Sequence, residues 1–155
     1  MVPRFELTVA EYCGASYVVA VNSATSALHI ALMALGVGAE DLVWTSPNTF
    51  VASSNAALYC GAQIDFVDIE PDTFNIDANL IEAAITKKTK AIMPVSLFGQ
   101  PADMETIYKI AKKYALKVIV DGAQSFGSVY KNKTDSNHGD ISCTSFFPAK
   151  PLGYY

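Results

Sequence analysis

The stretch that decides the fold is residues 117–125, which read Lys-Val-Ile-Val-Asp-Gly-Ala-Gln-Ser. The apolar run 118–120 does not alternate with polar residues, which is typical of a strand covered on both faces. The run ends at Asp121 and Gly122, a pair that favours a turn. Because parallel α/β sheets bind ligands beyond the carboxyl ends of their strands, the polar side chains from Asp121 onward are candidates for a site.

Similar β-rich runs alternate with helical patterns along the whole chain. Helices are predicted over 26–35, 49–59, 78–85 and 104–114, with a helix-like start over 5–12. The polar stretch 131–139 is interpreted as a flexible excursion. Strands are predicted over 17–21, 42–45, 63–67, 91–95, 117–120 and 141–146. This alternation predicts one α/β domain with three αβα layers and a mainly parallel sheet.

Composition limits the class of protein and its partners. The chain has 155 residues, 51% of them hydrophobic, and a net charge of −4. It therefore offers no basic surface for nucleic acid or an anionic membrane, and small molecules or proteins are the expected partners. It shows neither a membrane span nor a signal peptide, so a cytoplasmic location is expected. The cysteines follow no CxxC spacing and predict buried reduced thiols rather than a metal site: Cys13, Cys60 and Cys143.

A single lysine stands in an otherwise uncharged run near the end of the chain. Residues 145–153 read Ser-Phe-Phe-Pro-Ala-Lys-Pro-Leu-Gly and follow a predicted strand. Poor solvation disfavours the ammonium form of Lys150, and the neutral amine can attack a carbonyl carbon. The sequence therefore suggests a Schiff-base lysine, although a solvated loop residue between two prolines is the ordinary alternative.

Three other loops carry suggestive residues, each with an ordinary alternative. Residues 22–27 open a helix with small hydroxylated side chains that suit a phosphate, or simply cap that helix. Phe50 can stack on a planar ring or belong to the core. Asp121 can bind a metal, orient a base, pair with a protonated heterocyclic nitrogen, or only form a turn. Together with Lys150, these features match what pyridoxal phosphate (PLP) requires: a phosphate cradle, a stacking ring, a carboxylate and a lysine.

Four segments in this order carry a family resemblance: 22–28, 45–53, 121–127 and 145–153. They closely resemble the DegT/DnrJ/EryC1/StrS sugar aminotransferases, which are fold-type I PLP enzymes. The resemblance implies that Lys150 is catalytic, bonds to the cofactor and shuttles protons. It also implies that Asp121 pairs with the pyridine nitrogen. The remaining cofactor contacts that it implies are Gln124 at the ring hydroxyl, Phe50 on the ring face, and Ala24, Thr25 and Ser145 at the phosphate.

The same resemblance implies a reaction and partners. The expected activity moves an amino group from an amino acid, usually L-glutamate, to a 4-keto or 3-keto carbon of a UDP-linked sugar for cell-surface polysaccharide. A homodimer is expected, and residues 1–155 are expected to form part of the PLP-binding large domain without the C-terminal small domain. Two alternatives stay open. One is an inactive remnant that serves as a binding module, and the other is a Rossmann oxidoreductase, against which the absence of GxGxxG argues.

Overall fold

Five parallel strands form the central sheet of the computed structural model, which describes residues 1–153. The strand order is β2-β1-β3-β4-β7, and a separate antiparallel hairpin joins β5 to β6. The predicted α/β class with a mainly parallel sheet is confirmed. The strand bounds are β1 Leu42–Thr45, β2 Gln63–Phe66, β3 Thr89–Ile92, β4 Lys117–Asp121, β5 Val129–Tyr130, β6 Lys133–Thr134 and β7 Ile141–Cys143.

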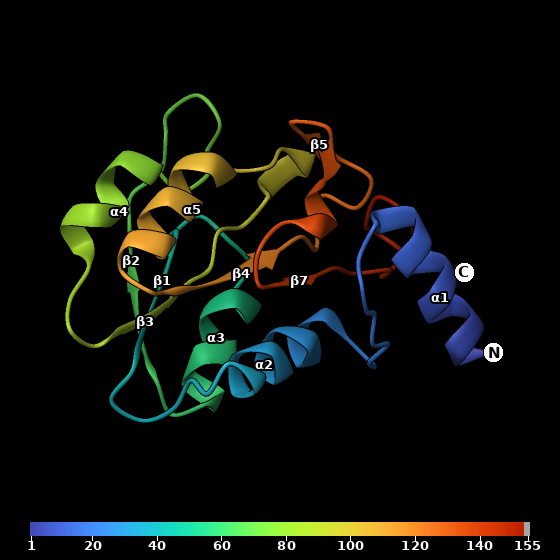
Figure 1. Cartoon of the computed structure of the whole chain (residues 1–155), viewed down its shortest axis with the longest axis horizontal. Helices are drawn as coiled ribbons and strands as arrows, with labels where there is room; N and C mark the ends of the chain where they lie inside the picture. The colour runs from blue at the N-terminus through green and yellow to red at the C-terminus, as the bar shows by residue number, and fades with distance from the viewer. Residues whose placement is uncertain (154–155) are drawn as a thin grey trace.

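Helices cover both faces of the sheet and make the predicted three layers (Figure 1). Helices α2 (Ala24–Ala34) and α3 (Ala52–Tyr59) pack on one face, and α4 (Ala78–Ala84) and α5 (Met104–Lys113) pack on the other. Helix α1 (Val2–Cys13) lies at one end of the molecule, beyond β7. Short 3-10 turns are η1 (Leu97–Gly99) and η2 (Asp135–Asn137).

Local sequence explains where these helices begin and which face they bury. In α5, the Asp103 side chain caps the helix by accepting from Thr106 N–H at 3.3 Å. Met104, Ile107 and Ile110 then recur at helical spacing and are buried against the sheet. Ser23 caps α2 and Asp77 caps α4 in the same way. Capping therefore marks the start of all three helices, and apolar spacing sets the buried face of α5.

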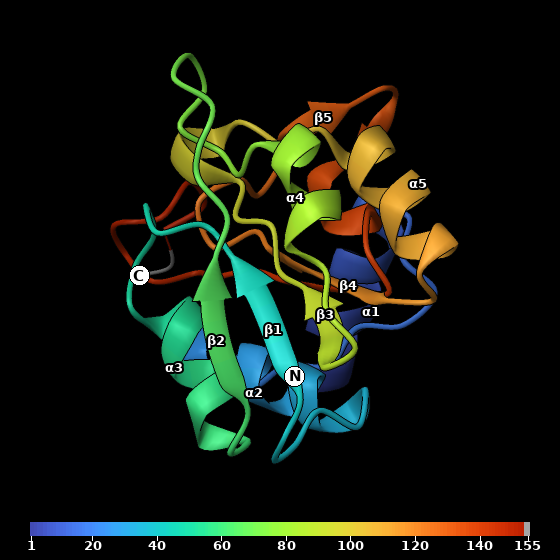
Figure 2. The ribbon, with the colours of Figure 1, turned by 90° about the vertical axis from the view of Figure 1, so that its left-hand side faces the viewer.

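Strands β3 and β7 end three residues earlier than their sequence patterns predict, whereas β4 ends one residue later. Pro94 has no N–H to donate, so the β3 ladder stops at Ile92 and resumes only as an isolated bridge between Val95 and Asp121. Strand β7 stops at Cys143, which pairs with Asp121, because β4 ends there. Figure 2 shows β1 and β2 running side by side in one direction, so the loops that follow the parallel strands share one edge of the sheet.

Three predictions about individual segments are wrong. Residues 17–21 form no strand, and Tyr17 and Val19 are 91% and 76% exposed; within residues 1–153 no strand pairs with them. A β-prone sequence alone is insufficient because the ladder requires a partner. The stretch 131–139 is ordered rather than a flexible excursion, since it contains β6 and the fully buried Asp135. Cys60 is half-buried, whereas Cys13 and Cys143 are buried as expected.

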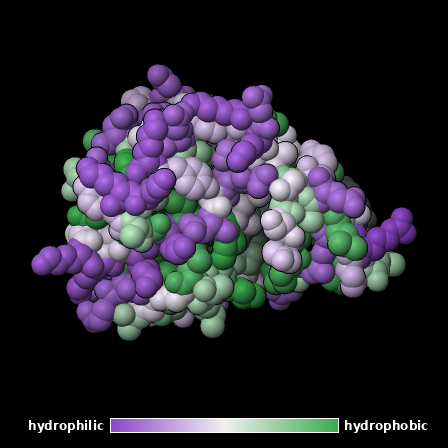
Figure 3. Space-filling view, in the orientation of Figure 1, coloured by the Kyte–Doolittle hydropathy of each residue, from purple (hydrophilic) through white to green (hydrophobic). Residues whose placement is uncertain are grey.

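The outer surface differs between the two helical layers. Figure 3 shows mostly hydrophilic residues over α4 and α5, and a hydrophobic region over α2 and α3. Ile30, Met33, Leu58 and Tyr59 are the large apolar residues that these two helices expose. Among the helices of residues 1–153, none is both long and apolar enough to cross a membrane.

Candidate active site

Asp121 is the last residue of β4 and is buried, with 5% of its surface exposed. Its carboxylate accepts two hydrogen bonds. The Ser53 hydroxyl donates to Oδ2 at 2.6 Å, and the Ala123 backbone N–H donates to Oδ1 at 3.2 Å. A Cβ at Gly122 would lie 3.2 Å from the Cys143 carbonyl oxygen, so the turn has little room for a side chain. The carboxylate is therefore held at the carboxyl end of a central strand.

The electrostatic environment of Asp121 is that of a desolvated anion. Burial raises the pKa of the Asp121 carboxyl above its ordinary value, while its two hydrogen bonds and the Lys150 ammonium oppose this rise. The Asp135 carboxylate adds to the rise. Burial, and then the charge of Asp121, raise the pKa of the Cys143 thiol to about 12, so this thiol is not a nucleophile at neutral pH. A cation placed against Asp121 would offset its desolvation.

Lys150 lies in the loop after β7 and is half-buried. Its backbone N–H donates to the Phe147 carbonyl oxygen at 2.8 Å, and its own carbonyl accepts from Gly153 N–H at 2.8 Å. These two bonds close consecutive turns around the lysine. Gly153 approaches the Pro148 backbone so closely that an added Cβ would collide with it. The loop conformation therefore depends on a glycine three residues beyond the lysine.

Gln124 and Lys150 face the same open hollow, which also contacts Ala149 and Pro151 and has a volume of about 480 Å³. The Oε1 atom of Gln124 accepts from the Phe98 backbone N–H at 3.2 Å. The amide NH2 group of Gln124 is then the part of this side chain that can donate to a ligand. Phe98 has a φ of 53°, an uncommon backbone conformation for an aromatic residue. Such strain is often found beside functional sites.

The predicted phosphate residues begin α2. Ser23 Oγ caps the helix by accepting from Ser26 N–H at 3.1 Å, which leaves Ala24 and Thr25 in the first turn. Helix α2 packs on β4 and β7, and its C-terminal end leads into β1, so its first turn lies toward the edge where the strands end. No hydrogen bond within residues 1–153 links Ala24 or Thr25 to Asp121 or Lys150. The structure therefore places these residues at the same edge without hydrogen bonds between them.

Ser145 and Phe50 occupy two further loops at this edge. Ser145 is buried, and its Oγ accepts from Phe147 N–H at 3.3 Å, which ties it to the turn that precedes Lys150. Phe50 is 67% exposed in the turn before α3, so it is not a core residue. Its carbonyl oxygen accepts from Ser53 N–H at 3.1 Å. Phe50 is therefore connected to Asp121 through one residue, Ser53, which makes a hydrogen bond to each.

An aromatic cluster joins α1 to the loops that hold Asp121 and Lys150. The ring of Phe146 contacts Phe5 and Phe126, with centroids 5.4 and 5.0 Å apart. Tyr12 stacks on Phe126 at 5.2 Å. Phe126 follows β4 and Phe146 follows β7, so the cluster fixes both loops relative to each other.

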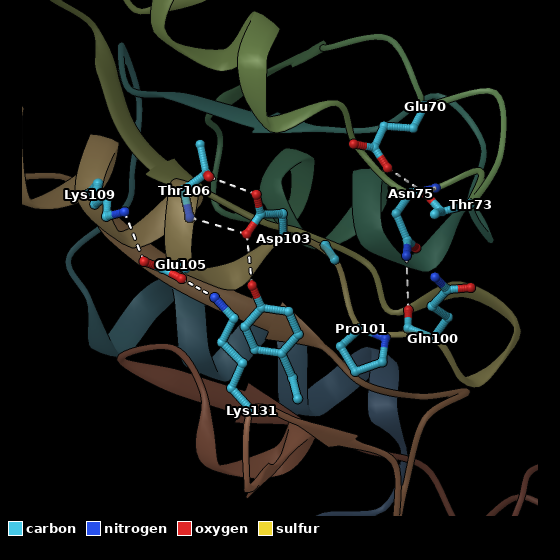
Figure 4. Close-up of a pocket in the computed structure, with 12 residues that line it drawn as sticks. Glu70, Thr73, Asn75, Gln100, Pro101, Asp103, Glu105, Thr106, Lys109 and Lys131 are labelled. Atoms are coloured by element: carbon cyan, nitrogen blue, oxygen red, sulfur yellow. Dashed lines mark hydrogen bonds and ion pairs between the residues drawn. The ribbon is translucent and has the colours of Figure 1, made fainter.

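A second pocket, of about 420 Å³, lies between α5 and the β5–β6 hairpin (Figure 4). Its carboxylates accept hydrogen bonds from, or pair with, other side chains of the protein. Asp103 accepts from Tyr130 at 2.8 Å, and Glu105 pairs with Lys109 at 2.8 Å and also with Lys131. These bonds join the hairpin to α5 and favour a structural role. Within residues 1–153, no group of three or more His, Cys, Asp or Glu side chains could hold a metal ion.

Comparison with known proteins identifies the family. A family model described as the DegT/DnrJ/EryC1/StrS aminotransferase family matches residues 1–155. This chain is a member of that family. A relative from Pseudomonas aeruginosa, UDP-2-acetamido-2-deoxy-3-oxo-D-glucuronate aminotransferase, is 50% identical over 154 residues, which are 99% of this chain and 43% of the relative. The chain thus spans less than half the length of this aminotransferase.

Solved structures of DegT/DnrJ/EryC1/StrS aminotransferases share the fold. One from Brucella abortus has a TM-score of 0.96 and 38% identity, and the alignment covers 99% of this chain and 43% of that structure. A sugar aminotransferase from Streptococcus pneumoniae, solved in its PLP form, has a TM-score of 0.93 and 32% identity, with coverage of 96% and 42%. The expectation of PLP as the cofactor is thereby confirmed for the family.

The sequence prediction assigned no role to Ser53, although this residue makes the shortest hydrogen bond to Asp121. Ser53 falls within the segment 45–53 that carries the family resemblance, and it stands three residues after Phe50. Residues three apart share a face near the start of a helix, so this spacing was an available signal. Asp135 gave no such signal, because its burial depends on how the hairpin packs.

Proposed function

We propose that this chain carries the cofactor-binding part of an aminotransferase that moves an amino group from an amino acid to a keto carbon of a UDP-linked sugar. The observation that carries the proposal is the buried Asp121 carboxylate at the end of β4, followed three residues later by Gln124, which lines the same hollow as Lys150. L-Glutamate is the expected donor, and cell-surface polysaccharide is the expected destination of the product. The 50% identical relative is named for an amination at a 3-oxo sugar, which favours the 3-keto over the 4-keto substrate.

The residues present fit PLP. A desolvated carboxylate suits a protonated pyridine nitrogen, because that cation offsets the cost of burying Asp121. The first turn of α2, with Ala24 and Thr25, offers backbone N–H groups and a positive dipole end to a phosphate. Ser145 adds a hydroxyl from the neighbouring loop, and the exposed Phe50 ring is free to stack. These residues would hold the phosphate, the ring nitrogen and the ring face.

Each side chain of the site has its own role in this proposal. PLP, when bound, supplies a conjugated ring that stabilises negative charge on the carbon next to the amino nitrogen. Asp121 would accept the N–H of the pyridine ring and favour the protonated nitrogen. Gln124 would donate from its amide to the ring hydroxyl. Lys150 would hold the cofactor through Nζ and would hold and return a proton at that atom.

A homodimer is part of the same proposal. Large aromatic side chains stay exposed near the strand ends, where a second subunit and the sugar nucleotide would cover them: Phe50 67%, Phe98 75% and Phe147 65%. Exposed aromatic residues gathered on one edge are typical of an interface. An inactive binding module is the weaker reading, because Lys150, Asp121 and Ser145 are all retained.

Borohydride trapping tests the assignment of Lys150. The chain is incubated with PLP, reduced with borohydride, digested and mapped by mass spectrometry. We expect label on Lys150 alone, and none there after Lys150→Ala. Lys131→Ala is the matched control, because that lysine is exposed and paired with Glu105. Label spread over surface lysines, or no label, would overturn the proposal.

A further inference from the structure

Ser53 is fully buried in the first turn of α3, although it is a polar residue. Its hydroxyl contacts two partners. Asp121 Oδ2 lies 2.6 Å from Ser53 Oγ, and Thr49 Oγ1 lies 3.0 Å from the same atom. Within residues 1–153, Ser53 is the only side chain that donates a hydrogen bond to Asp121.

The direction of these bonds follows from chemistry. An ionised carboxylate can only accept, so the single hydroxyl proton of Ser53 must point to Asp121. Thr49 must therefore donate its own proton to Ser53 Oγ. The result is a series of two hydrogen bonds that runs from Thr49 through Ser53 to Asp121, in which each bond polarises and strengthens the next. These bonds favour the ionised carboxylate, because a hydroxyl donates a stronger hydrogen bond to a charged oxygen than to a neutral one.

We propose that Ser53 is a positioning residue for Asp121, and that the Thr49–Ser53 hydroxyl pair fixes the Asp121 carboxylate in one orientation and in its charged form. This inference rests on the proposed function, because a protonated pyridine nitrogen requires a charged Asp121. Ser53 itself touches neither cofactor nor substrate in this scheme. It acts through Asp121.

The other groups around Asp121 cannot replace this pair. Lys150 favours the charged carboxylate, but the proposed bond to PLP removes its ammonium. Asp135 opposes the charge, and the Cys143 thiol is neutral at ordinary pH. The Ala123 N–H bond, at 3.2 Å, is longer than the Ser53 bond. Once Lys150 has reacted, Ser53 makes the shortest hydrogen bond that still supports the anion.

A cofactor-free titration tests the inference independently of PLP. Aspartate is labelled with carbon-13 at its side-chain carboxyl, and the Asp121 signal is assigned by its loss in Asp121→Asn. We expect Ser53→Ala to move the Asp121 titration midpoint to higher pH, because a hydrogen bond to the charged form is lost. Ser53→Thr, which keeps the hydroxyl, should restore the original midpoint. An unchanged midpoint in Ser53→Ala would overturn the inference.

The loaded protein gives a second readout. With PLP labelled by nitrogen-15 at the pyridine nitrogen, we expect Ser53→Ala to shift that signal toward the unprotonated value and to weaken PLP binding at least about tenfold. Thr49→Val should shift the nitrogen-15 signal and weaken PLP binding in the same direction, but by less. It serves as the test variant if Ser53→Ala does not fold. Equal signals in all variants would overturn the inference. If PLP fails to bind even the unmodified chain, the proposed function fails, while the cofactor-free titration still decides the role of Ser53.

Discussion

Two groups of carboxylates in this chain have opposite environments. In the pocket between α5 and the hairpin, Asp103 and Glu105 lie near the surface, and each has several partners from the chain itself. At the end of β4, Asp121 is buried and has only two hydrogen-bond donors among residues 1–153. The pKa of Asp103 and of Glu105 is lowered, whereas the pKa of Asp121 is raised. For Glu105 the cause is its two lysines, and for Asp121 it is burial.

The contrast separates a structural site from the one that we propose to be functional. Surface carboxylates whose partners come from the same protein join two elements and need no ligand. A buried carboxylate that its own chain leaves short of positive charge costs stability unless something else supplies the charge. Under the proposed function, the pyridine nitrogen of the cofactor would supply that missing positive charge.

The largest expected effect comes from Asp121→Asn. Leaving a buried charge without its partner costs about 3–5 kcal/mol, so PLP affinity should fall by between about a hundredfold and several thousandfold. Asp103→Asn is the control from the other pocket and should leave PLP affinity unchanged. Equilibrium titration of each variant with PLP, followed by absorbance, measures both. Equal losses in the two variants would remove the distinction between the pockets.

A smaller effect is expected from the loop that holds Lys150. Gly153→Ala places a methyl group against the Pro148 backbone, which must move to admit it. Overpacking of this kind costs about 1–3 kcal/mol, so trapping of PLP on Lys150 should slow by about fivefold or more. Gly38→Ala is the matched control, because a Cβ there meets nothing within 4 Å. The rate of label incorporation after borohydride reduction distinguishes the two, and equal rates would show that the loop geometry does not matter.

Much of the fold could be predicted from local patterns. The run 118–120 and the spacing of Met104, Ile107 and Ile110 predict β4 and α5, because burial on a fixed face imposes a fixed period. Residues 17–21 show where such reasoning stops. Their β-prone side chains satisfy the local rule, but pairing depends on a neighbouring strand that local sequence does not reveal.

The candidate site was predicted less completely. Lys150, Asp121 and Gln124 follow strand ends, and topology brings loops after parallel strands together, so their shared edge was predictable. The partnership of Ser53 with Asp121 links residues 68 positions apart, and no periodicity encodes such a contact. The family resemblance supplied the roles, while the structure supplied the hydrogen bonds that support them.

The smallest and most specific effect is a pH dependence of opposite sign in the two regions. Lys109 and Lys131 lower the pKa of Glu105 from 4.5 to about 2, so its contribution to stability is present above pH 4.5 and is lost as the pH falls toward 2. For Asp121, burial raises the folded pKa above the ordinary 3.8, so the effect has the opposite sign: stability falls as the pH rises from 3.8 through the raised pKa. Urea midpoints measured between pH 3 and 6 should therefore rise less steeply with pH in Glu105→Gln than in the unmodified chain, and more steeply in Asp121→Asn. Added salt should shrink only the Glu105 difference, because its ion pairs are exposed to solvent. If both variants changed the slope in the same direction, the two carboxylates would not differ in the way that their burial and partners require.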